Sequence, residues 1–389
     1  MTRVSPFVSP EQPPDSGRPI LIKPDQDGVI VRTAAIEWIS DPARALARLD
    51  EIPLASQQNG SDVSFVMAYS IADVIEPTSG VRAVQGEPVL GIITMGESVD
   101  EVTSSDFRVG SLRSESGRSW YESRVRRAIE LINAGDIFQA NIAHQLVAEF
   151  EGDCASLCAS VLQSGNNSAT HAFALADPEH DLAICSLSPE LLVHYNAATR
   201  GLVTKPIKGT RPVDRACELL LAEKDTAELN MITDLMRNDL GRVADAGTVR
   251  VTRHRVIEEV GHVAHAHARV ECTARRDLTL GDLIRAVFPA GSITGAPKVR
   301  AMQIIEELEE TPRGFAFGSM GTLFANGDLE LSVGIRTATI RGGALRLPVG
   351  AGIVTDSNPT SEWFETLDKA RTYAAALGST LVDLEDQMP

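Results

Sequence analysis

Four segments of the chain carry apolar residues at the three- and four-residue spacing of an amphipathic helix. They begin near Ser119, Lys224, Pro297 and Ser361. Glycine follows the first two stripes and proline opens the third, which are typical helix boundaries. Ser119 with Glu122 also fits a capping box. By length, 389 residues fit two to three domains or one large α+β domain.

Short apolar runs alternate with glycine, proline and aspartate turns in the first quarter of the chain. Residues 63–69 and 89–95 are typical of strands, and residues 42–49 of a further helix. Residues 1–18 are polar and proline-rich, so we expect a disordered tail and no secretory signal.

Two more strands are expected between the third and fourth helices. Apolar side chains alternate with small or polar ones over residues 331–336. Strand geometry therefore predicts that Arg336 points away from the apolar face. Two glycines at 342–343 turn the chain, and residues 345–354 return as the second strand.

The charge and the cysteines restrict the partners and the compartment. Asp and Glu number 53 against 36 Lys and Arg, a formal charge of −17, which argues against nucleic acid as a partner. No apolar run approaches the ~18 residues of a membrane span. The five cysteines form no CxxC pair and no zinc spacing, which indicates reduced thiols and a cytoplasmic location.

Two pairs of acidic residues stand on the polar sides of their predicted helices. Asp225 and Glu228 are three residues apart, and Glu362 and Glu365 repeat that spacing, with Lys369 one turn further. A solvated helix face is the default explanation for such pairs. The alternative is a shared hard cation such as Mg²⁺, which prefers carboxylate oxygens.

Three further segments contain small residues beside charged ones. Lys208 lies in the Pro- and Gly-flanked segment 205–212, and a lysine amine acts as a nucleophile only in a desolvated setting. Segment 288–298 places Ser292 and Lys298 at a helix start, where anions are favoured. In segment 349–353 tiny side chains would let a ligand reach the backbone, although close packing explains them equally well.

Histidines at 262, 265 and 267 form a short run, and His265 and His267 share one face of a predicted strand. A metal site is one interpretation. A packed or hydrogen-bonded role is the better one, because no other His or Cys cluster supports a metal.

Taken together, these segments resemble the chorismate-utilising enzymes. The resemblance extends in order from about residue 117 to 377, through six motifs: GDIFQANIAHQL, SPELLV, PIKGTRP, AELNMITDLMRNDLGRV, FPAGSITGAPKVRAM and VGAGIVTDSNPTSEWFETLDKA. It is closest to the component I proteins that aminate chorismate, the aminodeoxychorismate synthases. It implies an α+β fold of two packed antiparallel sheets flanked by helices, with a divergent N-terminal part at 19–112 and a chorismate-binding catalytic region at 113–380.

The resemblance also implies roles for individual residues. Mg²⁺ would lie between Glu228 and Glu365, with Asp225 and Glu362 close by. Substrate contacts would come from the following residues: Arg336, Gly350, Ala351, Gly352, Ser292, Lys369, Gln139 and Lys298. His265 would be the active-site histidine.

Lys208 distinguishes the relatives, because anthranilate synthases typically carry alanine there. In the implied mechanism the Lys208 amine attacks C2 of chorismate while Glu190 protonates the departing C4 hydroxyl, and ammonia then replaces the lysine. Gln139 argues against a water nucleophile, because isochorismate and salicylate synthases typically have lysine there. No cysteine lies in a glutaminase-type Gly-x-Cys-x-Gly turn, so a separate glutamine amidotransferase subunit is the implied source of ammonia.

The sequence departs from the family pattern at several positions. Ala316 and Thr322 stand where aromatic residues are common, and residues 166–170 lack the usual prolines. The poorly matched N-terminal part leaves open whether tryptophan is bound. Two alternatives therefore stay open: an anthranilate-synthase-like or divergent chorismate enzyme, and an idle subunit that binds chorismate without turnover.

Overall fold

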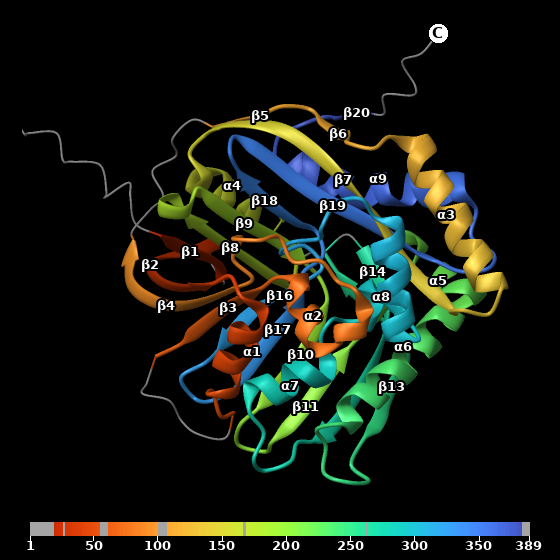
Figure 1. Cartoon of the computed structure of the whole chain (residues 1–389), viewed down its shortest axis with the longest axis horizontal. Helices are drawn as coiled ribbons and strands as arrows, with labels where there is room; N and C mark the ends of the chain where they lie inside the picture. The colour runs from red at the N-terminus through yellow and green to blue at the C-terminus, as the bar shows by residue number, and fades with distance from the viewer. Residues whose placement is uncertain are drawn as a thin grey trace, which may run out of the picture.

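The protein is described from a computed structural model of the chain (Figure 1). The described residues are 19–25, 28–54, 61–99, 107–165, 169–261 and 263–382. The expected tail at 1–18, His262 and residues 166–168 lie outside these ranges.

Helices and strands follow one another along the whole described chain. The helices are α1 (Pro42–Asp50), α2 (Ala72–Ile75), α3 (Arg118–Asn133), α4 (Cys154–Gly165), α5 (Glu218–Leu221), α6 (Glu223–Gly241), α7 (Leu280–Val287), α8 (Lys298–Leu308) and α9 (Pro359–Ala376). The strands before α5 are β1 (Ile20–Asp25), β2 (Gly28–Ile39), β3 (Val63–Met67), β4 (Leu90–Val99), β5 (Phe107–Val109), β6 (Leu112–Ser114), β7 (Gln139–Gly152), β8 (His171–Asp177), β9 (Leu182–Ser188), β10 (Leu191–Asn196), β11 (Gly201–Lys205) and β12 (Ile207–Pro212). The strands after α6 are β13 (Arg250–Val260), β14 (Val263–Thr273), β15 (Gly295–Ala296), β16 (Ser319–Leu323), β17 (Leu329–Val333), β18 (Thr337–Arg341), β19 (Ala344–Ile353) and β20 (Leu381–Val382).

The strands form one continuous antiparallel series. From β14 the series runs through β11, β10, β17, β16, β3, β4, β2, β1, β8, β9, β18 and β19 to β7. β12 and β13 flank β14, and β5, β6 and β15 pair with β7. The described pairing that runs parallel is that of β20 with β6. Strands from the N-terminal part thus join the two halves of the sheet.

Two hydrophobic cores lie on opposite faces of this series. In β8, Phe173 and Leu175 enter the first core, which includes residues of β3, β4, β10, β16, β17, α1, α6 and α7. Ala174 and Ala176 enter the second core, under α3, α4, α8 and α9. The period-two alternation of a strand therefore separates the cores. Figure 1 shows α3 and α9 beside β7 and β19, on the side of the second core.

The expected α+β class, with antiparallel strands and flanking helices, is confirmed, and the helices lie within two residues of their predicted starts. Two local predictions are wrong. Gly117, not Ser119, is the N-cap of α3, and Glu122 accepts hydrogen bonds from Arg118 and Arg126 instead of the cap. The single strand predicted over 331–336 ends at Val333, where β17 stops.

Among the helices of the described chain, none is both long enough and apolar enough to span a lipid bilayer.

Candidate active site

Residues from distant parts of the sequence meet where α6 and α9 approach β12, β14 and β19. Lys208 lies on β12, His265 on β14, and Gly350 to Gly352 on β19. Glu228 belongs to α6, and Glu362 and Glu365 to α9. Gln139 opens β7 and Ser292 lies in a short 3₁₀ turn, Gly291–Ile293.

Glu190 and Arg336 lie on two loops that hydrogen bonds hold together. The Val333 amide donates to the Glu190 carbonyl at 3.0 Å, and the Leu187 amide donates to the Arg336 carbonyl at 3.0 Å. Arg336 has φ of +50°, a left-handed conformation that costs a non-glycine residue about 1–3 kcal/mol and is found most often at functional sites. This turn replaces the predicted strand and sets the direction of the arginine.

The guanidinium of Arg336 is largely buried and has no ion pair or hydrogen bond among the described residues. Burial lowers its pKa, because the charged form loses hydration that no carboxylate replaces. An arginine held this way is available to a bidentate anion such as a carboxylate.

Lys208 and Glu190 place an amine beside a carboxyl group in a poorly hydrated setting. The Lys208 side chain is 14% exposed, and its Nζ lies 3.3 Å from Glu228 Oε2. Burial raises the pKa of Glu190 to about 7, and the nearby Lys208 charge only partly opposes that rise. The Glu190 carboxyl group therefore keeps its proton in a substantial fraction of molecules near neutral pH.

A second group of charges lies on α9 and at the start of α6. Glu362 is 2% exposed, and its Oε1 pairs with Lys224 Nζ at 2.9 Å, which bridges α9 to α6. Lys369 Nζ lies 2.8 Å from Glu365 Oε1 and donates to the Gly350 carbonyl at 2.9 Å. Partial burial pushes the Glu365 pKa upward, but the charges of Lys369, Lys224 and Lys208 outweigh it and lower the pKa.

Several buried polar atoms near these residues have no hydrogen-bond partner in the described part of the chain. They are Gln139 Nε2 and Oε1, Asn141 Nδ2, His265 Nε2, Ser292 Oγ and Glu362 Oε2. Ser292 lies close enough to Glu190 to lower its pKa more than the Lys208 charge does, although its hydroxyl is not at a hydrogen-bonding geometry. Buried polar groups are normally satisfied, so a cluster of exceptions indicates the position of a polar ligand.

Gly352 belongs to the same wall of the site. A β-carbon at this position would lie 2.5 Å from Gln139 Nε2 and 3.4 Å from Glu228 Oε2. Only glycine therefore lets β19 pass this close to Gln139 and the α6 carboxylate.

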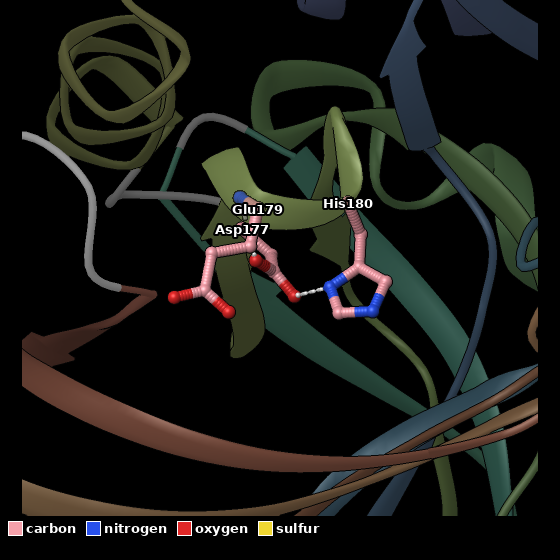
Figure 2. A group of neighbouring side chains, drawn as sticks. All are labelled: Asp177, Glu179 and His180. Atoms are coloured by element: carbon pink, nitrogen blue, oxygen red, sulfur yellow. Dashed lines mark hydrogen bonds and ion pairs between the residues drawn. The ribbon is translucent and has the colours of Figure 1, made fainter.

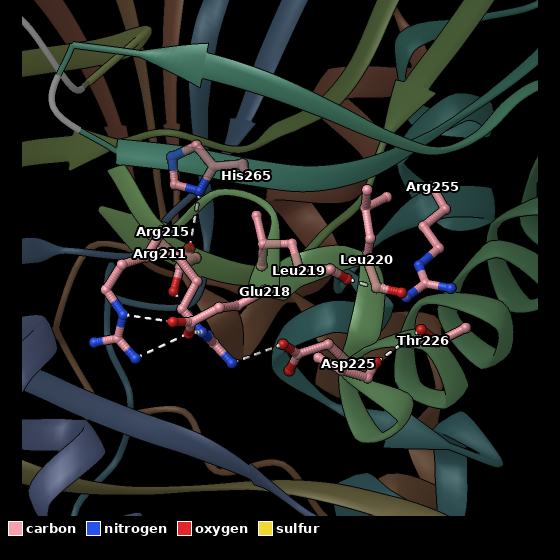
Figure 3. A network of polar contacts seen from close by, with 11 residues as sticks. Arg211, Arg215, Glu218, Leu219, Leu220, Asp225, Thr226, Arg255 and His265 are labelled. Carbon is pink, nitrogen blue, oxygen red and sulfur yellow. Dashed lines mark hydrogen bonds and ion pairs between the residues drawn. The ribbon is translucent and has the colours of Figure 1, made fainter. Parts of the chain in front are cut away.

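Neighbours of the predicted residues fix their orientation, as Figure 3 shows. Thr210 Oγ1 lies 2.8 Å from His265 Nδ1, and Arg211 pairs with Asp225 at 3.2 Å. Burial and the Arg336 charge lower the pKa of His265 to about 4, so its ring is neutral at pH 7. The predicted packed role of this histidine fits these contacts.

Lys298 makes a contact that its predicted role does not include. Its Nζ lies 2.7 Å from Asp239 Oδ2, and both side chains are nearly buried. The ion pair with Asp239 holds the Lys298 side chain against the end of α6. A contact between Lys298 and the substrate stays a prediction.

The donor set suits a hard cation. Carboxylates from Asp225, Glu228, Glu362 and Glu365 are the oxygen ligands that Mg²⁺ prefers. Glu362 Oε2 has no partner in the described chain, and a cation would provide one. Three of the four carboxylates are paired with lysines, so their negative charge is now balanced by ammonium groups that a bound cation could replace. The chemistry of these residues therefore fits a divalent cation, although no three of their carboxylate oxygens from different residues lie within 4.8 Å of one another in the described chain.

A second group of side chains with possible metal ligands is explained by its own hydrogen bonds. In the described chain, Asp177, Glu179 and His180 are the three side chains whose ligand atoms lie within 4.8 Å of one another (Figure 2). The Asp177 carboxylate already accepts from Trp38 Nε1 at 2.7 Å and contacts His180 Nδ1 at 2.8 Å. These bonds account for the group without an ion.

A cavity of about 370 Å³ lies away from these residues, near Lys23, Arg32, Asp62 and Phe324. None of the predicted site residues lines it.

Sequence reasoning missed three residues of the site. Lys224 pairs with Glu362, Thr210 orients His265, and Arg211 holds Asp225. Thr210 and Arg211 stand within the PIKGTRP motif and could have been found there. Lys224 precedes Asp225, but nothing local predicts its partner on α9.

The candidate site thus contains a largely buried arginine without a partner among the described residues, a proton-bearing carboxyl group and an enclosed amine. Residues 72–375 match the family described as chorismate binding enzyme, and the chain belongs to that family.

Curated relatives carry two kinds of name. The chain is 38% identical over 291 residues to the anthranilate synthase component I-like protein of Synechocystis, covering 73% of the chain and 59% of the relative. It is 41% identical over 276 residues to aminodeoxychorismate synthase component 1 of Salmonella typhimurium, covering 69% and 60%. The chain thus spans less than two thirds of the length of these relatives.

Solved structures share the whole fold. Anthranilate synthase component I from Streptococcus pneumoniae superposes with a TM-score of 0.72 at 25% identity, covering 96% of this chain and 95% of that one. The menaquinone-specific isochorismate synthase MenF from Escherichia coli gives 0.70 at 18% identity, covering 94% and 90%, a likeness of fold alone.

Proposed function

We propose that this protein is the synthase component that aminates chorismate at C4 to give 4-amino-4-deoxychorismate, the precursor of para-aminobenzoate and folate. The observation that carries the proposal is that Lys208 and Glu190 lie near each other inside a buried site. Lys208 is 14% exposed, and burial raises the pKa of Glu190 to about 7. An amine and a protonated carboxyl group are the two groups that a covalent amination requires.

The two residues would act in sequence on the bound ring. The Lys208 amine forms a bond to C2, both ring double bonds shift by one position, and the C4–O bond breaks. Glu190 gives its proton to the departing hydroxyl, which leaves as water, and takes up a proton released from the new C–N centre. Ammonia then adds at C4, both double bonds shift back, and the C2–N bond breaks as Glu190 returns its proton to the departing lysine amine. The new C4 ammonium group then loses one proton back to Glu190, which restores both residues. The net reaction exchanges hydroxyl for amine without redox change.

Other residues would hold the substrate in place for this chemistry. Arg336, with no partner of its own, would receive the enolpyruvyl carboxylate together with the backbone of Gly350 to Gly352. Ser292, Gln139, Lys298 and Lys369 would supply further polar contacts, and His265 would stay neutral beside the ring.

Glu228 and Glu365 would hold Mg²⁺, with Asp225 and Glu362 beside it. When bound, the cation would neutralise the ring carboxylate of chorismate and fix the position of the ring.

The ammonia would come from a separate glutamine amidotransferase subunit, and free ammonia would replace it in vitro. We also propose a cytoplasmic location, because the five cysteines are free thiols and three of them are buried.

Anthranilate formation is the second candidate. The name anthranilate synthase component 1 recurs among the relatives at 38–39% identity. In that case ammonia would enter at C2 and pyruvate would leave. Lys208, whose amine would occupy the C2 side of the ring, is the residue that favours the first candidate.

The test is to mix the protein with chorismate, MgCl₂ and ammonium and to identify the product by mass. A product that keeps its enolpyruvyl group and gains an amine in place of hydroxyl supports the proposal. Release of pyruvate with anthranilate would replace it by the second candidate.

No product, with chorismate binding retained in calorimetry, would indicate an idle binding subunit. A Lys205→Ala variant serves as the matched control, because Lys205 pairs with the half-exposed Glu258 and is not one of the predicted site residues.

A further inference from the structure

A buried hydrogen-bond chain reaches the helix that carries Glu362 and Glu365. His144 lies on β7 and is 4% exposed. Its Nδ1 lies 3.0 Å from Ser114 Oγ, and its Nε2 lies 2.9 Å from Thr366 Oγ1 on α9. Thr366 follows Glu365 directly and stands one turn after Glu362, so the contact is made next to both carboxylates on the helix.

The neighbouring bonds assign one tautomer to His144. The Thr366 hydroxyl donates to the Trp363 carbonyl at 2.7 Å, so its oxygen must accept from His144 Nε2–H. The Ser114 oxygen accepts from the Gly117 amide at 3.1 Å, so its hydrogen is free to point at Nδ1. Every donor in the chain then has an acceptor, and the ring is neutral.

Two aromatic rings pack against the same imidazole, and they also contact each other. His144 stacks on Trp363 of α9 with centroids 4.6 Å apart, and tilts against Tyr121 of α3 at 4.9 Å. Burial lowers the pKa of His144 to about 3, which keeps the ring neutral across the working range of most enzymes. The hydrogen bond from His144 to Thr366 therefore does not change with pH in the physiological range.

The position of α9 decides where its carboxylates point. A helix carries residues 362, 365 and 366 on adjoining parts of its surface, so a rotation about its axis moves both carboxylates together. On the His144 side, the bond to Thr366 and the stacking on Trp363 oppose that rotation. Thr360, at the start of α9, also donates to Glu122 of α3 at 2.9 Å.

We propose that His144 is a positioning residue for the cation site: through Thr366 it fixes the rotation of α9 and thereby the placement of Glu362 and Glu365. This inference rests on the proposed role of those carboxylates, but not on which product the enzyme forms.

The effect is measured as Mg²⁺ affinity by calorimetry. Loss of a residue that orients metal ligands typically costs about 10- to 100-fold in affinity. We expect His144→Leu, which removes the donor, to weaken Mg²⁺ binding by about tenfold. His144→Gln carries an amide donor of similar reach and should recover most of the affinity. Thr366→Val removes the acceptor and keeps the volume, so it should repeat the loss with the aromatic stack intact.

A second measurement examines the metal-free protein. Hydrogen–deuterium exchange of the α9 amides should quicken in His144→Leu and in Thr366→Val but stay near wild type in His144→Gln. His254→Leu, at an exposed position on β13, is the matched control and should change neither measurement.

The outcomes separate this inference from the proposed function. If the wild-type protein binds Mg²⁺ but yields no aminated product, the proposed activity is wrong. The role of His144 would still be tested by the Mg²⁺ affinities of the variants. Equal Mg²⁺ affinity in wild type, His144→Leu and Thr366→Val overturns the inference, whatever the product. Quicker exchange of the α9 amides in these variants without any loss of Mg²⁺ affinity would also overturn it, because the position of α9 would then not determine the cation site.

Discussion

The two sides of the candidate site shift the pKa of a glutamate in opposite directions. On the amine side, formed by Lys208, Glu190 and Ser292, burial raises the pKa of Glu190 to about 7. On the carboxylate side, formed by the acids and lysines of α9 and early α6, Glu365 has a lowered pKa, because Lys369 and two other lysines outweigh its partial burial.

Burial and charge compensation together decide which glutamate can act as an acid, since Glu190 is 5% exposed and the Glu365 side chain is 49% exposed. Glu190 has no ion-pair partner at contact distance in the described chain, so its neutral form is favoured. Glu365 contacts an ammonium group at 2.8 Å and keeps its charge. One carboxyl group is thereby suited to donate a proton and the other to bind a cation, as in enzymes whose paired acids have divergent environments.

The largest expected effect comes from removing the amine. Lys208→Ala should lower the amination rate with ammonium by at least about 10⁴-fold, since the nucleophile is lost. Mg²⁺-dependent binding of chorismate, followed by calorimetry, should persist because the carboxylate side is intact. Wild-type turnover in this variant, with Lys205→Ala as the reference, would defeat the covalent mechanism.

Replacement of the acid should have the next largest effect. Glu190→Gln keeps the shape but cannot give a proton to the leaving hydroxyl, so the rate should fall by about 10²- to 10⁴-fold, the usual contribution of a general acid. Chorismate affinity should change little. Glu130→Gln, on the exposed face of α3, controls for the substitution. A rate within threefold of wild type, roughly, would remove Glu190 from the mechanism.

The raised pKa of Glu190 also predicts how stability depends on pH. The folded carboxyl group titrates at about 7 and the unfolded one near 4.5. Its contribution to folding is therefore complete below 4.5 and is lost as pH rises through 7. Relative to Glu190→Gln, the wild-type unfolding free energy should fall by about 3 kcal/mol between pH 4 and pH 8. Urea titrations of both proteins across that range check this, and parallel curves would contradict it.

The smallest expected effect lies on the carboxylate side. Glu365→Gln should weaken Mg²⁺ binding by about 10- to 100-fold and weaken chorismate binding at limiting Mg²⁺ with it. Asp368→Asn, on the same helix but paired with Arg371 at the surface, is the control. Unchanged affinity for Mg²⁺ would count against Glu365 as a ligand. The lowered pKa of Glu365 would then not mark a cation-binding side of the site.

The sequence predicted the helices well because their signals are local. The apolar stripes with Gly and Pro boundaries place α6, α8 and α9 within two residues of their starts. The Ser119 capping box failed because Gly117 begins the helix first and Glu122 finds stronger partners in two arginines. A short pattern cannot rank such competing contacts.

The site was predictable as a set of residues and not as a set of contacts. Motif resemblance named Glu190, Lys208 and Glu365, but the partners Lys224 and Asp239 act across long sequence separations that no local pattern encodes. Arg336 fell within an alternating run typical of a strand. At its left-handed turn the Arg336 carbonyl accepts a hydrogen bond from the Leu187 amide at the end of β9, a contact that tertiary structure alone supplies.

The pairing of β3 with β16 has a consequence for how the protein is made. Met67 lies opposite Ser319, so one edge of β3 must wait for a partner about 250 residues further on, which at ~5–20 residues per second emerges from the ribosome roughly 10 to 50 s later. During that interval the nascent chain carries an open, apolar strand edge. The N-terminal strands that connect the two halves of the sheet are thus the part of the newborn protein most exposed to aggregation, and chaperone dependence should concentrate there.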